Sequence, residues 1–157
     1  MDTFHEENGF TLIESIIAVT LVSLTITGLF LAWYFVESRD RRLENYWQYK
    51  ETVELAYQVT HQSIRDKAGL PITLINSGQG ISFTGTDNKS WTFTKEGNNY
   101  KLVHDTKEEI LIANICNNAN FIVTGNMVAI NIGVTTPPDW TGANDLNING
   151  EVLIRNP

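Results

Sequence analysis

The sequence contains one long apolar segment without a charged side chain, and this segment limits the folds open to the chain. No Asp, Glu, Lys, Arg or His occurs in residues 15–36. At about 1.5 Å per residue, a helix over this segment is roughly 33 Å long, and the hydrocarbon core of a bilayer is about 30 Å thick. A helix of this length in a soluble domain keeps a polar face, whereas this segment has no charged face. We therefore predict a transmembrane helix over residues 10–36.

The end of the apolar segment distinguishes an anchor from a cleavable secretory signal. The apolar region of a secretory signal is about 7–15 residues long and ends in a small-x-small cleavage site. This segment is longer and ends in the bulky side chains of Trp33, Tyr34 and Phe35. We expect it to remain in the protein as a membrane anchor.

The composition excludes several classes of protein. With 157 residues, the chain has room for one domain and an appendage. Its 18 acidic and 11 basic residues give a net charge of −7, which argues against a nucleic-acid binder, because such a protein needs Lys and Arg against the phosphates. The single cysteine, Cys116, excludes an internal disulfide and a zinc site made of cysteine pairs. We predict that Cys116 is a small buried residue.

Glu14 lies close to the start of the apolar segment and needs an explanation. A carboxylate in lipid costs about 2.5–3.5 kcal/mol even on the lenient insertion scale, so it is expected to have a partner. No Lys, Arg or His occurs between His5 and Arg39. Glu14 therefore either contacts water and headgroups at the membrane surface or pairs with a group on another molecule. A free α-amino group is one such group, if the chain is cut just before the apolar segment.

The residues around Glu14 resemble a known processing signal. The stretch Gly9-Phe10-Thr11-Leu12-Ile13-Glu14-Ser15, followed by the apolar segment, resembles the N-terminal signal of type IV pilins and type II secretion pseudopilins. The resemblance implies that prepilin peptidase cuts between Gly9 and Phe10 and that Phe10 is then N-methylated. It also implies that Glu14 is the retained acidic residue that takes part in subunit assembly.

The leader departs from this family in its charge. Residues 1–9 contain Asp2, Glu6 and Glu7 and no Lys or Arg, and three arginines follow the apolar segment at positions 39, 41 and 42. The positive-inside rule alone would place the C-terminal region inside the cell. The resemblance instead places the leader on the cytoplasmic side and the C-terminal region outside. We follow the resemblance, because the cleavage motif requires a leader that faces the peptidase.

A second helical pattern continues beyond the apolar segment over residues 37–69. Apolar and aromatic residues recur there in steps of three and four, which predicts an amphipathic helix. They are Leu43, Tyr46, Tyr49, Val53, Ala56, Tyr57 and Ile64. Gly69, as a left-handed cap, and Pro71 are expected to end the helix. We predict one helix from Phe10 to Ala68 whose second half packs on a β-sheet, in preference to forming a coiled-coil stalk.

The remaining residues, 70–157, read as a β-rich head. Alternating or β-branched runs predict strands at residues 72–75, 81–84, 91–94, 100–104, 110–113, 121–124, 128–134 and 152–155. Turns are predicted at residues 85–88, 96–99, 125–126 and 149–150, and residues 135–147 read as a loop. We expect an α+β fold with a leader (1–9), a transmembrane helix (10–36), its amphipathic continuation (37–69) and an antiparallel β-rich head.

Parts of the head are loosely similar to one group within the family. A Tyr-x-Leu strand precedes Glu-Ile-Leu-Ile-Ala-Asn-Ile at residues 109–115, a Phe-x-Val run follows, and a strand ends the chain near Arg155 and Asn156. This order resembles the larger J-type and W-type minor pseudopilins.

No complete catalytic site is visible in the sequence. Asp105, Glu108 and Glu109 read as a solvated loop and not as an acid pair. Asp145, Asn147 and Asn149 match the first half of a calcium loop, but the twelfth position is Asn156 and not an acidic residue. An Asn149-Gly150 turn between strands, with Leu146 and Ile148 pointing inward, explains the same residues. We therefore expect no cofactor, no metal and no enzymatic activity.

These features predict a minor pilin or pseudopilin, a structural subunit of a type IV pilus, competence or secretion filament. The expected partners are other pilins, prepilin peptidase and the assembly platform of the cytoplasmic membrane. The protein would cross that membrane once with its head outside and then enter a surface filament. Two alternatives stay open: a membrane-anchored receptor, adhesin or sensor module that does not assemble, and an exported enzyme that uses the loops at residues 105–109 or 145–149.

Overall fold

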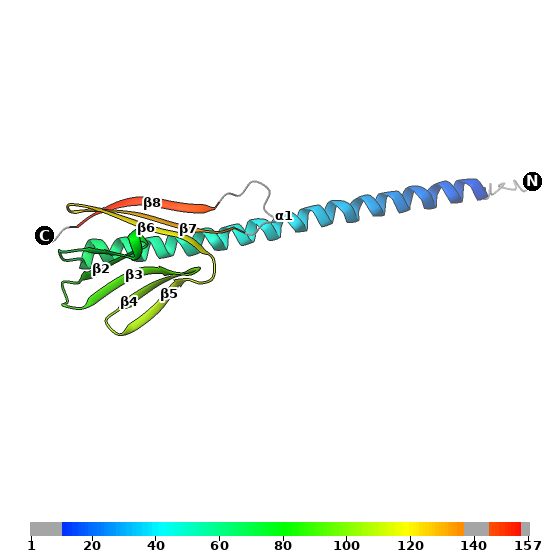
Figure 1. Ribbon diagram of the computed structural model, residues 1–157. Helices are drawn as coiled ribbons and strands as arrows, with labels where there is room; N and C mark the ends of the chain where they lie inside the picture. Colours follow the sequence, from blue (N-terminus) through cyan, green and yellow to red (C-terminus); the bar gives the residue numbers. More distant parts are fainter. Residues whose placement is uncertain (1–10, 137–144, 155–157) are drawn as a thin grey trace, which may run out of the picture. The chain divides into compact units, whose positions relative to one another are not determined.

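The computed structural model describes residues 11–136 and 145–154 and shows one long helix followed by strands (Figure 1). The helix α1 covers Leu12–Lys67. After it come β1 (Thr73–Ile75), the short 3-10 helix η1 (Asn76–Gly78), β2 (Gly80–Thr84), β3 (Ser90–Glu96), β4 (Asn99–His104), β5 (Lys107–Ile112), β6 (Cys116–Thr124), β7 (Met127–Val134) and β8 (Leu146–Leu153). All strand pairs among the described residues are antiparallel. The predicted α+β fold is confirmed.

The chain divides into two compact units, Met1–Leu43 and Glu44–Pro157, and α1 contributes to both. In the first unit, the described residues form the apolar half of the helix, and their large side chains are exposed. In the second unit, the rest of α1 is accompanied by all the strands.

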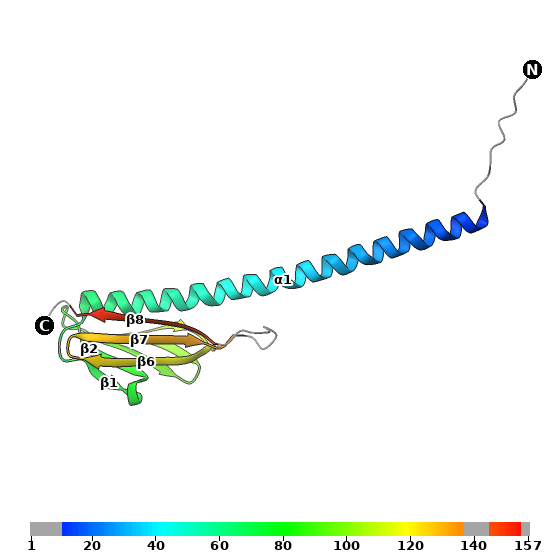
Figure 2. The same cartoon turned by 90° about the horizontal axis from the view of Figure 1, so that it is seen from above.

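The strands of the second unit form two sheets. One sheet has the order β1-β2-β3-β4-β5, and the other has the order β6-β7-β8. Figure 2 shows β6, β7 and β8 side by side with one face open to the viewer. Two of the predicted turns are tight hairpins whose glycines, Gly97 and Gly125, have φ of +58° and +59°, a region where glycine is favoured.

One hydrophobic core joins the inner faces of both sheets to the helix of this unit. Val53, Ala56 and Ile64 of α1 are buried, and Tyr49 and Tyr57 are partly buried against the same core. The prediction that this half of the helix packs on a sheet is confirmed. The largest fully buried side chains include Phe93 on β3, Tyr100 on β4 and Phe121 on β6.

Thr60 is a buried helix residue that the apolar pattern missed, because threonine was counted with the polar face. Its Oγ1 donates to the Ala56 carbonyl at 2.7 Å and lies 2.9 Å from the Tyr100 Oη. Since the Thr60 proton is used, the Tyr100 hydroxyl is the donor between them. Burial raises the pKa of Tyr100, so this hydroxyl keeps its proton. The bond ties α1 to β4 of the five-stranded sheet.

We expect Tyr100→Phe to lower the free energy of unfolding by about 1 kcal/mol, because one buried hydrogen bond is lost without a change in packing. Denaturant unfolding of the full chain measures this value. Tyr49→Phe is the matched control, since no hydrogen bond joins the Tyr49 hydroxyl to another described residue. Equal stability of the Tyr100 variant and the unmodified protein would show that the bond contributes nothing.

Several predicted boundaries differ from the structure. The strand predicted at residues 110–113 is β5, which begins three residues earlier, so Glu108 and Glu109 lie in a strand and not in a loop. The strand predicted at 121–124 begins at Cys116, and the one predicted at 152–155 begins at Leu146. The predicted Asn149-Gly150 turn is wrong, because both residues pair with β7 inside β8. The inward direction of Leu146 and Ile148 is correct.

The predicted reason for the end of α1, a left-handed Gly69, is also wrong. The helix ends at Lys67, and Gly69 is not left-handed, since its φ lies outside the positive range. Its amide instead donates to the Thr84 carbonyl at 3.2 Å. A Cβ at this position would lie 3.1 Å from that oxygen, so glycine permits a close approach between the chain after the helix and β2.

Candidate functional site

The start of α1 is organised around Thr11 and Glu14. The Glu14 Oε2 atom accepts hydrogen bonds from the Thr11 backbone N–H at 3.0 Å and from the Thr11 Oγ1 at 2.9 Å. The Glu14 backbone N–H lies 3.4 Å from the same hydroxyl. This is a capping box, in which the residue before the helix and the third helical residue satisfy each other's free donors. It anchors the carboxylate against the first turn.

The capping box has the sequence signature Thr-x-x-Glu at residues 11–14. Thr11 is a neutral partner of Glu14, which the absence of Lys, Arg and His between His5 and Arg39 does not reveal. Both contacts fall on Oε2, and Oε1 has no hydrogen bond to another described residue. Within the described part of the chain, one carboxylate oxygen is therefore left for a further donor. The predicted cleavage pair, Gly9 and Phe10, lies outside the described residues.

The apolar half of α1 satisfies its own polar side chains. The hydroxyls of Thr20, Ser23, Thr25 and Thr27 each donate to the carbonyl four residues earlier, all at 2.8 Å. This bonding is the usual way for Ser and Thr to avoid an unpaired hydroxyl in an apolar environment. Together with its length and apolar composition, which are sufficient to cross a membrane, it fits the helix to lipid or to other helices.

Gly28 lies in this apolar half and has no role in packing within the described structure. A Cβ built on it would meet no atom within 4 Å. Small residues of this kind allow two helices in a membrane to approach closely. Gly28 therefore leaves room for another helix to approach α1 closely.

The arginines that follow the apolar half lie on the same helix. Arg41 pairs with Glu37 one turn earlier, an exposed pair that contributes little stability.

The calcium candidate does not form a loop. Residues 146–153 form the extended strand β8, with Asn147 opposite Gly133 and Asn149 opposite Asn131. An extended strand cannot wrap its side chains around one cation. Asn147 also uses its amide to donate to the Asp145 backbone carbonyl at 3.3 Å. Among the described residues, no group of three or more His, Cys, Asp or Glu could hold a metal.

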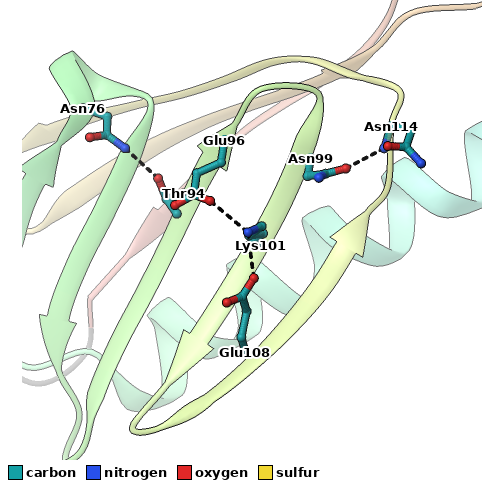
Figure 3. A network of polar contacts seen from close by, with 7 residues as sticks. All are labelled: Asn76, Thr94, Glu96, Asn99, Lys101, Glu108 and Asn114. Carbon is teal, nitrogen blue, oxygen red and sulfur yellow. Dashed lines mark hydrogen bonds and ion pairs between the residues drawn. The ribbon is translucent and has the colours of Figure 1, made fainter.

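The acidic residues near the β4–β5 turn do not converge on a catalytic pair. Glu108 contacts the Lys101 Nζ at 2.7 Å, and Glu96 contacts the same nitrogen at 2.8 Å (Figure 3). These two carboxylates, Glu108 above all, raise the pKa of Lys101. Neighbouring strand residues point to opposite faces, so Glu109 is directed away from this network. The cluster is an ion-pair network on the outer face of the five-stranded sheet.

The N-terminal segment is the part of the chain that is similar to a known protein family. A family described as "Prokaryotic N-terminal methylation motif" matches residues 5–30, which contain the Gly9-Phe10 pair, the Thr11–Glu14 capping box and the first turns of the apolar helix. The segment is a prepilin-type N-terminal motif. This motif supports the type IV pilin and pseudopilin superfamily and, with it, processing by prepilin peptidase.

The match does not extend beyond the N-terminal segment. No curated protein and no solved structure matches the chain significantly. The narrower similarity to J-type or W-type pseudopilins is not confirmed. The N-terminal apolar helix and the prepilin-type motif are consistent with a single-pass membrane anchor.

Proposed function

We propose that this protein is a minor pilin or pseudopilin, a structural subunit and not an enzyme, that assembles into a filament through its N-terminal helix. The prepilin-type motif carries the proposal. An apolar helix with satisfied hydroxyls and exposed side chains supports it, because such a helix can leave lipid for a bundle of similar helices without exposing polar groups. The proposed partners are other pilins, prepilin peptidase and the membrane assembly platform.

The geometry around Glu14 supplies a way to set the register of subunits. Cleavage after Gly9 would free the Phe10 amine, and the Glu14 Oε1 of a neighbouring subunit would accept a hydrogen bond from it. Thr11 would hold the other oxygen, Oε2, as it does here. In a low-dielectric bundle, the net stability of such a pair is small after desolvation, but a misplaced subunit would leave a buried charge unpaired. The pair would therefore select one axial position.

Mass spectrometry of the mature N-terminus tests this proposal. In a cell with an active prepilin peptidase, we expect a chain that begins with N-methylated Phe10. In a strain that lacks the peptidase, we expect the same chain to retain residues 1–9. Retention of residues 1–9 in the presence of the peptidase would refute the filament proposal and favour a membrane-anchored binding module that does not assemble.

A further inference from the structure

The outer face of the β6-β7-β8 sheet carries asparagine side chains in aligned rows. Asn120, Asn131 and Asn149 lie opposite one another on the three strands. The adjacent row, two residues along each strand, consists of Asn118, Gly133 and Asn147. This face is the one turned to the viewer in Figure 2.

These asparagines oppose the local preference of the chain. Asparagine is depleted in β-strands because its amide competes for backbone hydrogen bonds. The outer face of the other sheet has an ordinary solvated surface, with Lys101 between Glu96 and Glu108 (Figure 3). Residues that conflict with their local structure without a packing benefit are expected at functional sites. The asparagine rows therefore need a reason beyond solubility.

The same face is hollowed. An open depression of about 340 Å³ is lined by residues of all three strands, among them the outward-facing Asn120, Ile122, Ala129, Asn131, Asn149 and Glu151. The small Ala129 lies on the central strand β7, between the longer side chains of Ile122 on β6 and Glu151 on β8. The central strand therefore forms the floor and the outer strands form the walls. The volume is at the lower end of the range for small-molecule sites, about 300–1,000 Å³.

The side chains around the depression include one charged group and several amides that can form hydrogen bonds. Glu151 is the one charged residue among the described outward-facing positions of β6, β7 and β8. Asn131 accepts a hydrogen bond from Asn118 at 2.9 Å. The amides of Asn120 and Asn149 have no hydrogen bond to another described residue. Each amide offers both donors and an acceptor, and Ile122 is 59% exposed at the edge.

We propose that this depression binds a neutral oligosaccharide. Sugar hydroxyls both donate and accept hydrogen bonds, so they match amides that do the same, and the C–H groups of a pyranose ring would lie on Ala129 and Ile122. A neutral ligand suits a face whose described strand positions carry one carboxylate and no cation, in a chain whose net charge is −7. A phosphate or an acidic sugar would be repelled. This binding function is separate from filament assembly through α1 and does not depend on it.

The test is a titration of the full chain with cellohexaose, maltohexaose and chitohexaose, followed by saturation-transfer NMR and calorimetry. The protein is kept in a sugar-free detergent, because alkyl maltosides would present a competing neutral sugar. We expect at least one of the three to bind with Kd of about 1 mM or tighter. No binding of any of them at about 10 mM, ten times that Kd, would overturn the proposal.

Asn149→Val and Asn147→Val form a matched pair of variants on β8. The first removes an amide that lines the depression, and the second removes an amide of the same strand and face that does not line it. We expect Asn149→Val to weaken binding about fivefold to tenfold, as for the loss of one hydrogen bond, and Asn147→Val to leave it unchanged. Asn120→Val is a second variant on β6, in case Asn149→Val does not fold.

Three results would contradict the assignment to this depression. Unchanged binding in Asn149→Val or, if that variant does not fold, in Asn120→Val would place the sugar elsewhere. An equal loss in Asn147→Val would also do so. Association of the full chain with itself that Asn149→Val abolishes would show that the face binds a second copy instead of a sugar.

Discussion

Replacing Glu14 by alanine is expected to leave membrane insertion intact and to reduce incorporation into filaments by about tenfold, which corresponds to about 1.4 kcal/mol. Insertion depends on the apolar residues that follow Glu14, and these are unchanged. In the proposed filament, assembly would lose both the acceptor for a neighbour's Phe10 amine and the capping bonds to Thr11. Quantitative immunoblotting of membrane and sheared-filament fractions measures the two effects separately.

Two further variants separate the charge of Glu14 from its capping role. Glu14→Gln keeps an oxygen that accepts from Thr11 but removes the negative charge, so it is expected to assemble less well than the unmodified protein and better than the alanine variant, which also loses the capping bonds. Thr11→Val keeps the charge but removes the hydroxyl that holds Oε2, and a milder loss is expected. Normal assembly of Glu14→Gln would show that capping, and not charge pairing, is the role of Glu14.

The sequence predicted the helix and also strands such as β3, in which the outward-facing residues themselves favour the extended conformation. The apolar segment and the later stripe placed the helix over residues 10–68, and it covers Leu12–Lys67. Strand β3 was predicted from Trp91 and Phe93, which alternate with threonine, and Phe93 is fully buried. In such segments, local preference and tertiary burial agree, so the pattern is sufficient.

The errors in the strands have a common physical cause. Strands β6 and β8 begin earlier than predicted because Asn117, Asn118 and Asn147 favour turns locally, yet the alternate residues of these strands are buried and hold the segments extended. Strand β5 begins earlier because its first residues are charged, as is usual at a sheet edge. Burial of the inner face outweighs the local preference of the outer face, and a single sequence does not show which partner strand supplies that burial.

The sequence indicates candidate functional residues that are neighbours along the chain, and it does not indicate residues that only strand pairing brings together. The residues of the processing signal are contiguous, so roles for Gly9, Phe10 and Glu14 could be proposed from the sequence, and the Thr11 contact could have been predicted from the capping-box spacing. The asparagine rows are different, because Asn120, Asn131 and Asn149 come together only through the register of three strands. No spacing along the chain indicates that alignment.

Gly150→Val is expected to lower the free energy of unfolding by about 3 kcal/mol, the upper part of the range for overpacking. Gly150 lies inside β8 opposite the buried Ile130. A Cβ at this position would overlap the Tyr57 hydroxyl and lie 2.9 Å from the ring carbon that carries it. Valine favours a strand more than glycine does, by up to about 1 kcal/mol, but this gain is smaller than the cost of displacing a ring held between the helix and the sheet.

The effect of Tyr57 on the stability loss of Gly150→Val distinguishes an extended β8 from an Asn149-Gly150 turn. In a turn, a valine would be unfavourable because of its backbone conformation, and the loss would be the same whatever residue stands on α1. In the strand, the loss arises from the Tyr57 ring, so Tyr57→Ala is expected to recover most of it, and the double variant is expected to be more stable than the sum of the single changes predicts. Denaturant unfolding of the four proteins measures this coupling. A loss that persists undiminished in the Tyr57→Ala background would mean that α1 does not pack on β8 through this contact.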